Sequence, residues 1–323
     1  MNWRAVLPAL FVTMWCGGYT AGSIATRTIE PLALTFWRFA IAATVLILVA
    51  LASRAPWPRS RVEWRNLALV GLSLQALFYS TGYLGMAMGV PAALSALLGG
   101  IAPLAIAAAG VVFLDERLTR RQWAGSALGV AGVVLAVLDR LGQARVGVGI
   151  AFTLLGVAGF TAGTLLQRRT GSAMDLRTGG AVQFSVAALA VLPVALLHGG
   201  LALPATPGAL GSLAYLALGN SVGATSLLFL LLRSRYAADA TSLLYLVPPL
   251  TALVGALLLG QPLGPASWAG LVIATAGVVL TKRTVLSKRT VLTKRAAPAT
   301  TREATPRPAA ERRADEAGAM RAA

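Results

Sequence analysis

Residues 101 to 135 read IAPLAIAAAGVVFLDERLTRRQWAGSALGVAGVVL, and residues 246 to 280 read LVPPLTALVGALLLGQPLGPASWAGLVIATAGVVL. The second stretch repeats the first at an offset of 145 residues without a gap, so that Pro103 falls on Pro248. Each copy contains an apolar segment, a short polar hinge and a second apolar segment. Self-similarity at a fixed offset indicates a duplicated architecture, so we interpret the chain as one unit written twice.

The composition predicts a membrane protein. Of the 323 residues 57% are hydrophobic and 12% are charged, and the mean hydropathy is +0.73; a soluble domain has about 25% charged residues. Apolar runs near 20 residues recur along the chain, and each can cross a bilayer core of about 30 Å. Because a spanning backbone must satisfy its own hydrogen bonds and the runs are too long for barrel strands, we expect an all-α integral membrane protein.

Each copy holds five expected spans. They lie at about 7–24, 32–51, 67–86, 92–114 and 123–138, and at 150–166, 179–197, 210–232, 238–259 and 268–280. We therefore expect repeats at 1–141 and 146–281, followed by a basic, disordered tail at 282–323. The first span could be a signal peptide, but the offset pairs it with the internal segment 152–167. Pro103 and Pro248, inside the fourth and ninth spans, should kink both helices at matching depth.

Basic residues in the loops set the expected orientation. With the N-terminus in the cytoplasm, cytoplasmic segments before the tail hold thirteen arginines and outer loops hold three. Five spans in each copy then place the second copy upside down, with both termini cytoplasmic. Such inverted repeats recur in secondary transporters. The basic tail has two interpretations, attraction to anionic lipid or a stop-transfer anchor with a dispensable extension.

Several function classes are disfavoured. The net charge of +17 suggests nucleic acid, but the basic residues lie in loops and tail. One cysteine, Cys16, and one histidine, His198, offer no intrachain disulfide and no histidine cluster for a metal; we expect no metal and no cofactor. A membrane-embedded enzyme needs paired catalytic groups that the chain lacks. A structural or signalling membrane protein remains an alternative to a transporter.

The hinge carries a family likeness. The pattern Pro103-Leu104, Leu114-Asp115-Glu116-Arg117-Leu118 and Gln122-Trp123-Ala124-Gly125 resembles the hallmark of EamA-type transporters of the drug/metabolite transporter superfamily. The second copy, with Pro248, Gln261-Pro262-Leu263 and Trp268-Ala269-Gly270, is similar. The resemblance covers about residues 8–281 and implies ten helices in inverted five-helix repeats, a central cavity and movement of a metabolite, often export. The chain departs from the family pattern at one position. The acidic hinge residue is present as Glu116 in the first copy, but its mate, the residue at the offset of 145 in the second copy, is Gln261.

Arg38 is the most informative candidate residue. It is the only charge well inside a span, roughly 10 Å from the outer end of its helix, and an intramembrane charge is a functional-site hypothesis by default. We expect it to face the cavity and bind a substrate carboxylate or phosphate. Two alternatives are that its side chain snorkels to the headgroups or that it pairs with helix-end carbonyls. Its mate at the offset is Gln183, again polar within a span.

Other candidates for the cavity lining are polar or aromatic residues within spans. They are Gln75, Tyr79 and Asn220, together with Trp15, Trp37 and Tyr245. Aromatic residues also anchor helices at bilayer interfaces, and amides also form interhelical hydrogen bonds. Glu116 is either a proton-coupling carboxylate or a helix-end ion pair, and we favour the ion pair because the site is interfacial.

The sequence thus predicts a secondary transporter in a bacterial inner membrane, working by alternating access. The expected substrate is a small organic metabolite, an amino acid or another carboxylate, exported from the cytoplasm, with Pro103 and Pro248 helping the helices to flex. Repeated GxxxG spacings such as Gly125/Gly129 fit close packing within one bundle better than a homodimer, which remains a possible partner state.

Overall fold

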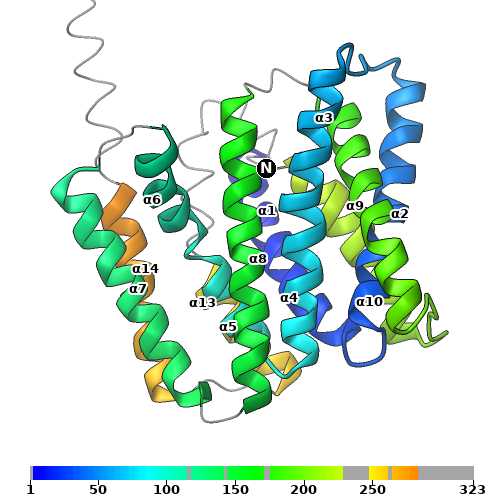
Figure 1. Ribbon diagram of the computed structural model, residues 1–323. Helices are drawn as coiled ribbons and strands as arrows, with labels where there is room; N and C mark the ends of the chain where they lie inside the picture. The colour runs from blue at the N-terminus through cyan, green and yellow to red at the C-terminus, as the bar shows by residue number, and fades with distance from the viewer. Residues whose placement is uncertain are drawn as a thin grey trace, which may run out of the picture. The chain divides into compact units, whose positions relative to one another are not determined.

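The computed structural model describes residues 3–114, 118–141, 144–170, 175–227, 247–260 and 264–282, and within these ranges it contains helices and no strand (Figure 1). Five stretches are long and apolar enough to cross a membrane. They are Pro31–Ala52, Arg61–Ala87, Ala92–Phe113, Val146–Gln167 and Leu176–His198. The expected all-helical membrane protein is confirmed at this level. The predicted tail beyond Lys282, the hinge residues Glu116 and Gln261, and Tyr245 lie outside the described residues.

The first repeat contains eight helical elements in the described residues. They are α1 (Trp3–Ala25), α2 (Pro31–Ala52), α3 (Arg61–Val70), the π-helix η1 (Gly71–Leu77), α4 (Phe78–Ala87), the pair α5 (Ala92–Gly99) and α6 (Ala102–Leu114), and α7 (Arg120–Leu141). The second repeat follows the same pattern. Its described elements are α8 (Ala144–Arg169), α9 (Leu176–His198), α10 (Pro207–Ala214), the π-helix η2 (Tyr215–Ala224), α13 (Val247–Leu259) and α14 (Pro265–Lys282).

Proline and capping residues begin several helices where the sequence predicts span starts. Pro31 and Pro207 stand at the first position of α2 and α10, where a missing N–H costs nothing. Asp175 caps α9 by accepting from the Arg177 backbone N–H at 2.9 Å. Hydrogen bonds from the Arg177 side chain favour the ionised carboxylate and lower the pKa of Asp175 to about 2.

The mates α2 and α9 pack against each other and run antiparallel. At one end the Thr178 hydroxyl donates to the Pro56 carbonyl oxygen at 2.8 Å. In the middle, the rings of Phe39 and Phe184, themselves mates at the offset, stack with centroids 5.2 Å apart. At the other end Gly199 packs beside Glu30. Contacts between early residues of one helix and late residues of the other require opposite directions.

The mates α7 and α14 form a second antiparallel pair, side by side in Figure 1. The Ser267 hydroxyl donates to the Ala136 carbonyl oxygen at 3.1 Å. A Cβ placed on Gly132 would lie 2.3 Å from the Ala274 backbone nitrogen, and one placed on Gly277 would lie 2.3 Å from that of Gly129. The GxxxG spacing of α7 therefore serves packing within the chain, as small residues do where two membrane helices approach closely.

Two π-helical segments occur at matching places in the two repeats. η1 covers Gly71–Leu77, and the offset of 145 carries it onto residues 216–222, within η2. In a π-helix the backbone bonds from residue i to i+5, and such segments are found mostly at functional sites. The repeat therefore extends from sequence to an uncommon backbone conformation.

The fourth expected span is interrupted rather than bent. α5 ends at Gly99 and α6 begins at Ala102, so the break falls at Gly100 and Ile101, one turn before the predicted kink. Pro103 stands in the first turn of α6, where it lacks the N–H that would continue the helix from Gly99. Pro248 stands in the first turn of α13, and the residues before Val247 lie outside the described residues.

Candidate functional site

Arg38 is buried at the centre of a set of side chains from three helices. Its side chain is 1% exposed. Nε donates to the Ser221 hydroxyl at 2.8 Å, Nη2 donates to the Asn220 Oδ1 at 2.7 Å, and Nη1 donates to the Tyr83 hydroxyl. The guanidinium therefore turns into the bundle and does not snorkel to the headgroups. This brings a charge of the first repeat onto two polar residues of the second.

Two adjacent residues of the π-helix η2 reach one guanidinium. The π turn is wider than an α turn, so neighbouring side chains are separated by a somewhat smaller angle around the axis. The Ser221 hydroxyl donates to the Leu216 carbonyl oxygen, five residues earlier, at 3.0 Å. Asn220 and Ser221 are both buried, at 6% and 2% exposure. Their amide and hydroxyl oxygens can then act together as acceptors for Arg38.

The orientation of Asn220 is set by α1. Its Nδ2 donates to the Met14 carbonyl oxygen at 3.1 Å, which turns Oδ1 toward Arg38. The Tyr215 hydroxyl donates to the same carbonyl oxygen at 2.9 Å. The adjacent Gly17 and Gly18 make this possible, because a Cβ on either would lie within 2.5 Å of Tyr215 or Asn220 atoms.

Aromatic residues of α4 complete the surroundings of Arg38. The Tyr79 ring lies under the guanidinium, with its centroid 3.9 Å from Cζ. A cation over a tyrosine face is attracted by the negative face of the ring, and this attraction strengthens when water is excluded. Tyr79 also packs edge to face on Phe39, with ring centroids 5.5 Å apart. The aromatic residues hold the cation in place without neutralising it.

No acidic side chain balances Arg38 among the described residues. The one ion pair found there joins Arg177 to Asp175 at 2.7 Å, at the start of α9. All the hydrogen-bond partners of Arg38 given above are neutral. A guanidinium has five N–H donors, and three are used by Ser221, Asn220 and Tyr83. A buried positive charge with donors to spare favours an anionic ligand.

A cavity of about 50 Å³ reaches Arg38. Most of its lining residues come from α1 and α4, and the others from α2, α5, α8 and η2. They are Trp15, Gly18, Tyr19, Arg38, Phe78, Tyr79, Gly82, Tyr83, Met86, Ser95, Thr153 and Asn220. We call it the Arg38 cavity. A second cavity of about 100 Å³, at the break between α5 and α6, shares Trp15, Tyr19 and Phe78 with it. We call this the break cavity.

The structure brings together four of the sequence-predicted site residues. Arg38, Tyr79, Asn220 and Trp15 all line the Arg38 cavity. The two predicted gating prolines line the break cavity, with Trp15 again on its wall. Of the pair Arg38 and Gln183, which correspond at the offset of 145, only Arg38 lines this cavity.

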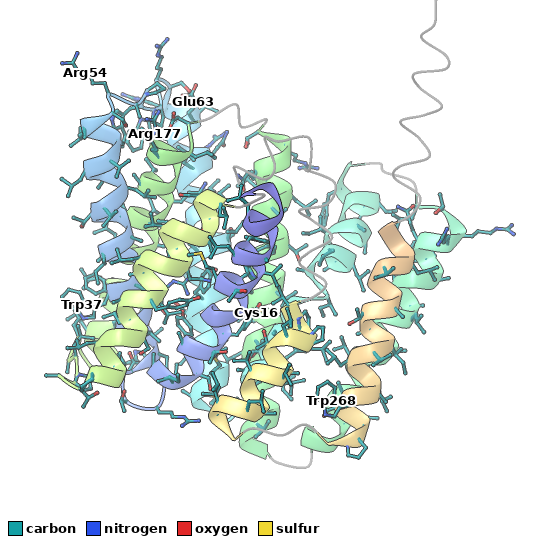
Figure 2. The ribbon with its side chains drawn as sticks, turned by 180° about the vertical axis from the view of Figure 1, so that it is seen from behind. Cys16, Trp37, Arg54, Glu63, Arg177 and Trp268 are labelled. Carbon is teal, nitrogen blue, oxygen red and sulfur yellow. The ribbon has the colours of Figure 1, made fainter. Side chains whose placement is uncertain are left out.

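The remaining predicted residues lie elsewhere. Trp37 donates from Nε1 to the Leu201 carbonyl oxygen at 3.0 Å and lies near the end of the bundle in Figure 2. Gln75 and Gln183 are buried, each 8% exposed, but line neither of the two cavities. Gln183 packs through its backbone against Gly71 of η1. Tyr245 is outside the described residues.

Sequence reasoning missed two hydroxyls, Ser221 and Ser95. Ser221 follows Asn220 directly, so an α-helical period would place it away from Arg38. Ser95 lies in an apolar run and has no charged neighbour in the sequence. The only available signal for Ser221 was its place beside a polar residue within a span.

Gly82 offers a test of whether the Arg38 cavity is used. It lines that cavity, and a Cβ placed on it would meet nothing within 4 Å. Gly82→Leu should fill the cavity and abolish ligand binding, while helix propensity rises by about 1 kcal/mol. Gly211→Leu is the control, because Gly211 of α10 lines neither cavity and a Cβ placed on it would also meet nothing within 4 Å, so ligand binding should be unchanged. Full ligand binding by Gly82→Leu would exclude this cavity as the site.

Among the described residues, no three histidine, cysteine or acidic side chains lie close enough together to hold a metal ion. Comparison with known proteins then identifies the family. The EamA-like transporter family matches residues 3–138 and again residues 147–283.

The chain belongs to the EamA-like transporter family.

The two matches coincide closely with the two expected repeats, and they confirm the resemblance inferred from the hinge motif. Members of this family are transporters, so the chain is a membrane transporter and not an enzyme, and the structural or signalling alternative is set aside.

Two relatives extend the comparison. The chain is 30% identical over 291 residues to a protein named uncharacterized inner membrane transporter YedA of Escherichia coli (strain K12), covering 87% of this chain and 92% of the relative. It is 30% identical over 287 residues to a probable terminal-alkyne amino-acid exporter of Streptantibioticus cattleyicolor, covering 86% of this chain and 92% of the relative.

A solved crystal structure is also similar to this EamA-like chain. It has a TM-score of 0.59 and 18% sequence identity, and the match covers 88% of this chain and 98% of that chain. At 18% identity this similarity shows a shared fold and nothing about function.

Proposed function

We propose that this protein is a secondary transporter that exports a small organic carboxylate from the cytoplasm by alternating access. The observation that carries the proposal is Arg38, a cation 1% exposed and without an acidic partner in the described residues, at the wall of a cavity. Holding an unpaired charge in the membrane interior is expensive. A substrate carboxylate would supply the missing negative charge each time the site is loaded.

The proposal includes ten membrane spans, arranged as two inverted repeats of five. The antiparallel packing of α2 on α9 and of α7 on α14 supports inversion, because each pair consists of mates at the offset of 145. The repeats are 1–141 and 146–281, and 282–323 is a cytoplasmic tail. Both termini are cytoplasmic on the arginine count. The inner membrane location agrees with the printed name of the Escherichia coli relative.

Two arginines at helix ends support rocking of one repeat against the other. Arg27, just after α1, donates from Nη2 to the Leu259 carbonyl oxygen at the end of α13, at 3.4 Å. Arg169, at the end of α8, donates from Nη2 to the Phe113 carbonyl oxygen near the end of α6. Each bond joins the first helix of one repeat to the fourth span of the other. Positive charge at a helix C-terminus is favourable, and such exposed contacts are weak enough to open in turn.

The substrate class follows from Arg38 and the small, mainly apolar cavities beside it. An amino acid or another small carboxylate fits a single fixed cation among aromatic side chains. The name of the Streptantibioticus cattleyicolor relative, an amino-acid exporter, points in the same direction.

Efflux from proteoliposomes tests the proposal. The full chain would be reconstituted, loaded with a mixture of amino acids and small carboxylates, and the released solutes would be identified by mass spectrometry. We expect faster release of at least one carboxylate than from protein-free vesicles, and no such gain with Gly82→Leu. Equal release from Gly82→Leu and wild-type vesicles for every solute would overturn the proposed function.

A further inference from the structure

α5 presents an unused hydrogen-bonding group to the Arg38 cavity. The Ser95 side chain is 3% exposed, and its hydroxyl has no hydrogen-bond partner among the described residues. It lines the same cavity as Arg38, from a different helix. A buried hydroxyl left unsatisfied is costly, and most such groups in proteins are paired. The hydroxyl therefore points to a ligand that completes it.

A backbone acceptor lies one turn further along α5. In a continuous helix the Gly99 carbonyl oxygen would accept from residue 103, but Pro103 has no N–H. The amides that follow bond further back, Gly100 to Ala96 at 2.8 Å and Ile101 to Leu98 at 3.2 Å. Gly99 lines the break cavity. Residues four apart lie about one turn apart on a helix, so the Ser95 hydroxyl and the Gly99 carbonyl belong to neighbouring turns of α5 beside the two cavities, and we call the two groups the strip.

The strip and Arg38 have opposite electrostatic character. Arg38 is a cation, whereas the C-terminal end of α5 carries the negative end of a helix dipole. Tyr19 is adjacent to both the strip and Arg38, because it lines both cavities. A Cβ placed on Gly99 would lie 2.6 Å from the Tyr19 hydroxyl oxygen. Broken membrane helices commonly offer such carbonyl ends to cations in transporters.

We infer that Ser95 and the C-terminal end of α5 form a second subsite, which binds an amine of the ligand whose carboxylate lies at Arg38. The inference rests on the proposed function and narrows it. The substrate is a carboxylate that also carries an amine, and a simple carboxylate binds through Arg38 alone. The ammonium finds a hydroxyl and a carbonyl as acceptors, so no acidic residue is needed to hold it.

Matched ligands on the full chain in lipid nanodiscs test the subsite. Two pairs differ only by an amine, L-leucine with 4-methylpentanoate and 5-aminopentanoate with pentanoate. Binding is measured by calorimetry, which avoids the passive flux of free acids across a bilayer. In at least one pair the amine should tighten binding by about tenfold, the scale of a hydrogen bond to a charged group. Ser95→Ala should remove most of that gain and leave the simple carboxylate unaffected.

Ser80→Ala is the matched control. Ser80 is a second buried serine, 8% exposed, whose hydroxyl also has no partner in the part of the chain that the structure describes, but it lines neither of the two cavities. It should leave the amine preference intact. The inference is overturned if no pair prefers the amine, if no ligand of either pair binds, or if Ser95→Ala preserves the preference. The proposed function fails separately, when Gly82→Leu vesicles release every solute as the wild type does.

Discussion

Asn220→Asp should abolish binding of a carboxylate substrate while the helices stay packed. The substitution places a carboxylate where Oδ1 of Asn220 now accepts from the Arg38 Nη2 at 2.7 Å. The side chain keeps its shape, so no cavity arises, and the one unfavourable contact is the new oxygen facing the Met14 carbonyl oxygen in place of Nδ2. The new negative charge pairs with Arg38 and competes directly with the substrate carboxylate. At an effective dielectric constant near 20, a charge pair at about 4 Å is worth about 4 kcal/mol, which corresponds to about 1,000-fold weaker binding.

Folding of this variant is expected to remain near that of the wild type. The amide donor to the Met14 carbonyl oxygen is lost, but the Tyr215 hydroxyl still donates to it at 2.9 Å. A buried ion pair is often close to neutral for stability, because desolvation offsets the attraction. The melting temperature in detergent and a monodisperse elution profile report folding, and calorimetry reports binding. Wild-type affinity in Asn220→Asp would contradict a role of Arg38 as the carboxylate site.

Substitutions at Arg38 itself should impair function to different degrees, with Arg38→Ala more severe than Arg38→Lys. Arg38→Ala removes the charge and should abolish transport in a protein that still inserts in membranes. Arg38→Lys keeps the charge but loses the planar fork that bonds Ser221, Asn220 and Tyr83 together. It should retain weak, measurable binding. Transport by Arg38→Ala at the wild-type rate would show that the site assignment is wrong.

Gly132→Ala should strongly lower the stability of the packed pair α7 and α14. The added Cβ would lie 2.3 Å from the Ala274 backbone nitrogen and 2.6 Å from the Gly270 carbonyl oxygen. Both neighbours are backbone atoms, which cannot rotate away, so the helices must separate. Overpacking of this kind costs about 1–3 kcal/mol. The free energy of unfolding, followed by circular dichroism in mixed micelles, measures the effect.

Gly211→Ala is the control for the glycine prediction. Gly211 lies within α10, and a Cβ placed there would meet nothing within 4 Å. The substitution should therefore show only the helix propensity gain of about 1 kcal/mol. If Gly132→Ala is as stable as Gly211→Ala, the close approach of α7 and α14 does not hold in the membrane.

The sequence alone determined the membrane class and showed the duplication. For the five candidate spans that the structure describes, hydropathy gives the limits within about six residues, because the bilayer requires a run of apolar side chains of known length. α2, for example, was expected at 32–51 and is found at Pro31–Ala52. Arg38 was also recognised from sequence, since a charge inside an apolar run is rare and expensive.

Only the tertiary structure decided which polar groups meet. Gln183 and Gln75 were predicted to line the cavity together with Arg38 and Asn220, yet only the latter two line the Arg38 cavity. Ser221 joins them from the π-helix η2, and Ser95 joins them because α5 turns one face to the cavity. Hydropathy records how apolar a helix is along its length, whereas a binding site depends on how each helix is wound and rotated against its neighbours. That rotation comes from contacts between distant segments, which a linear pattern does not contain.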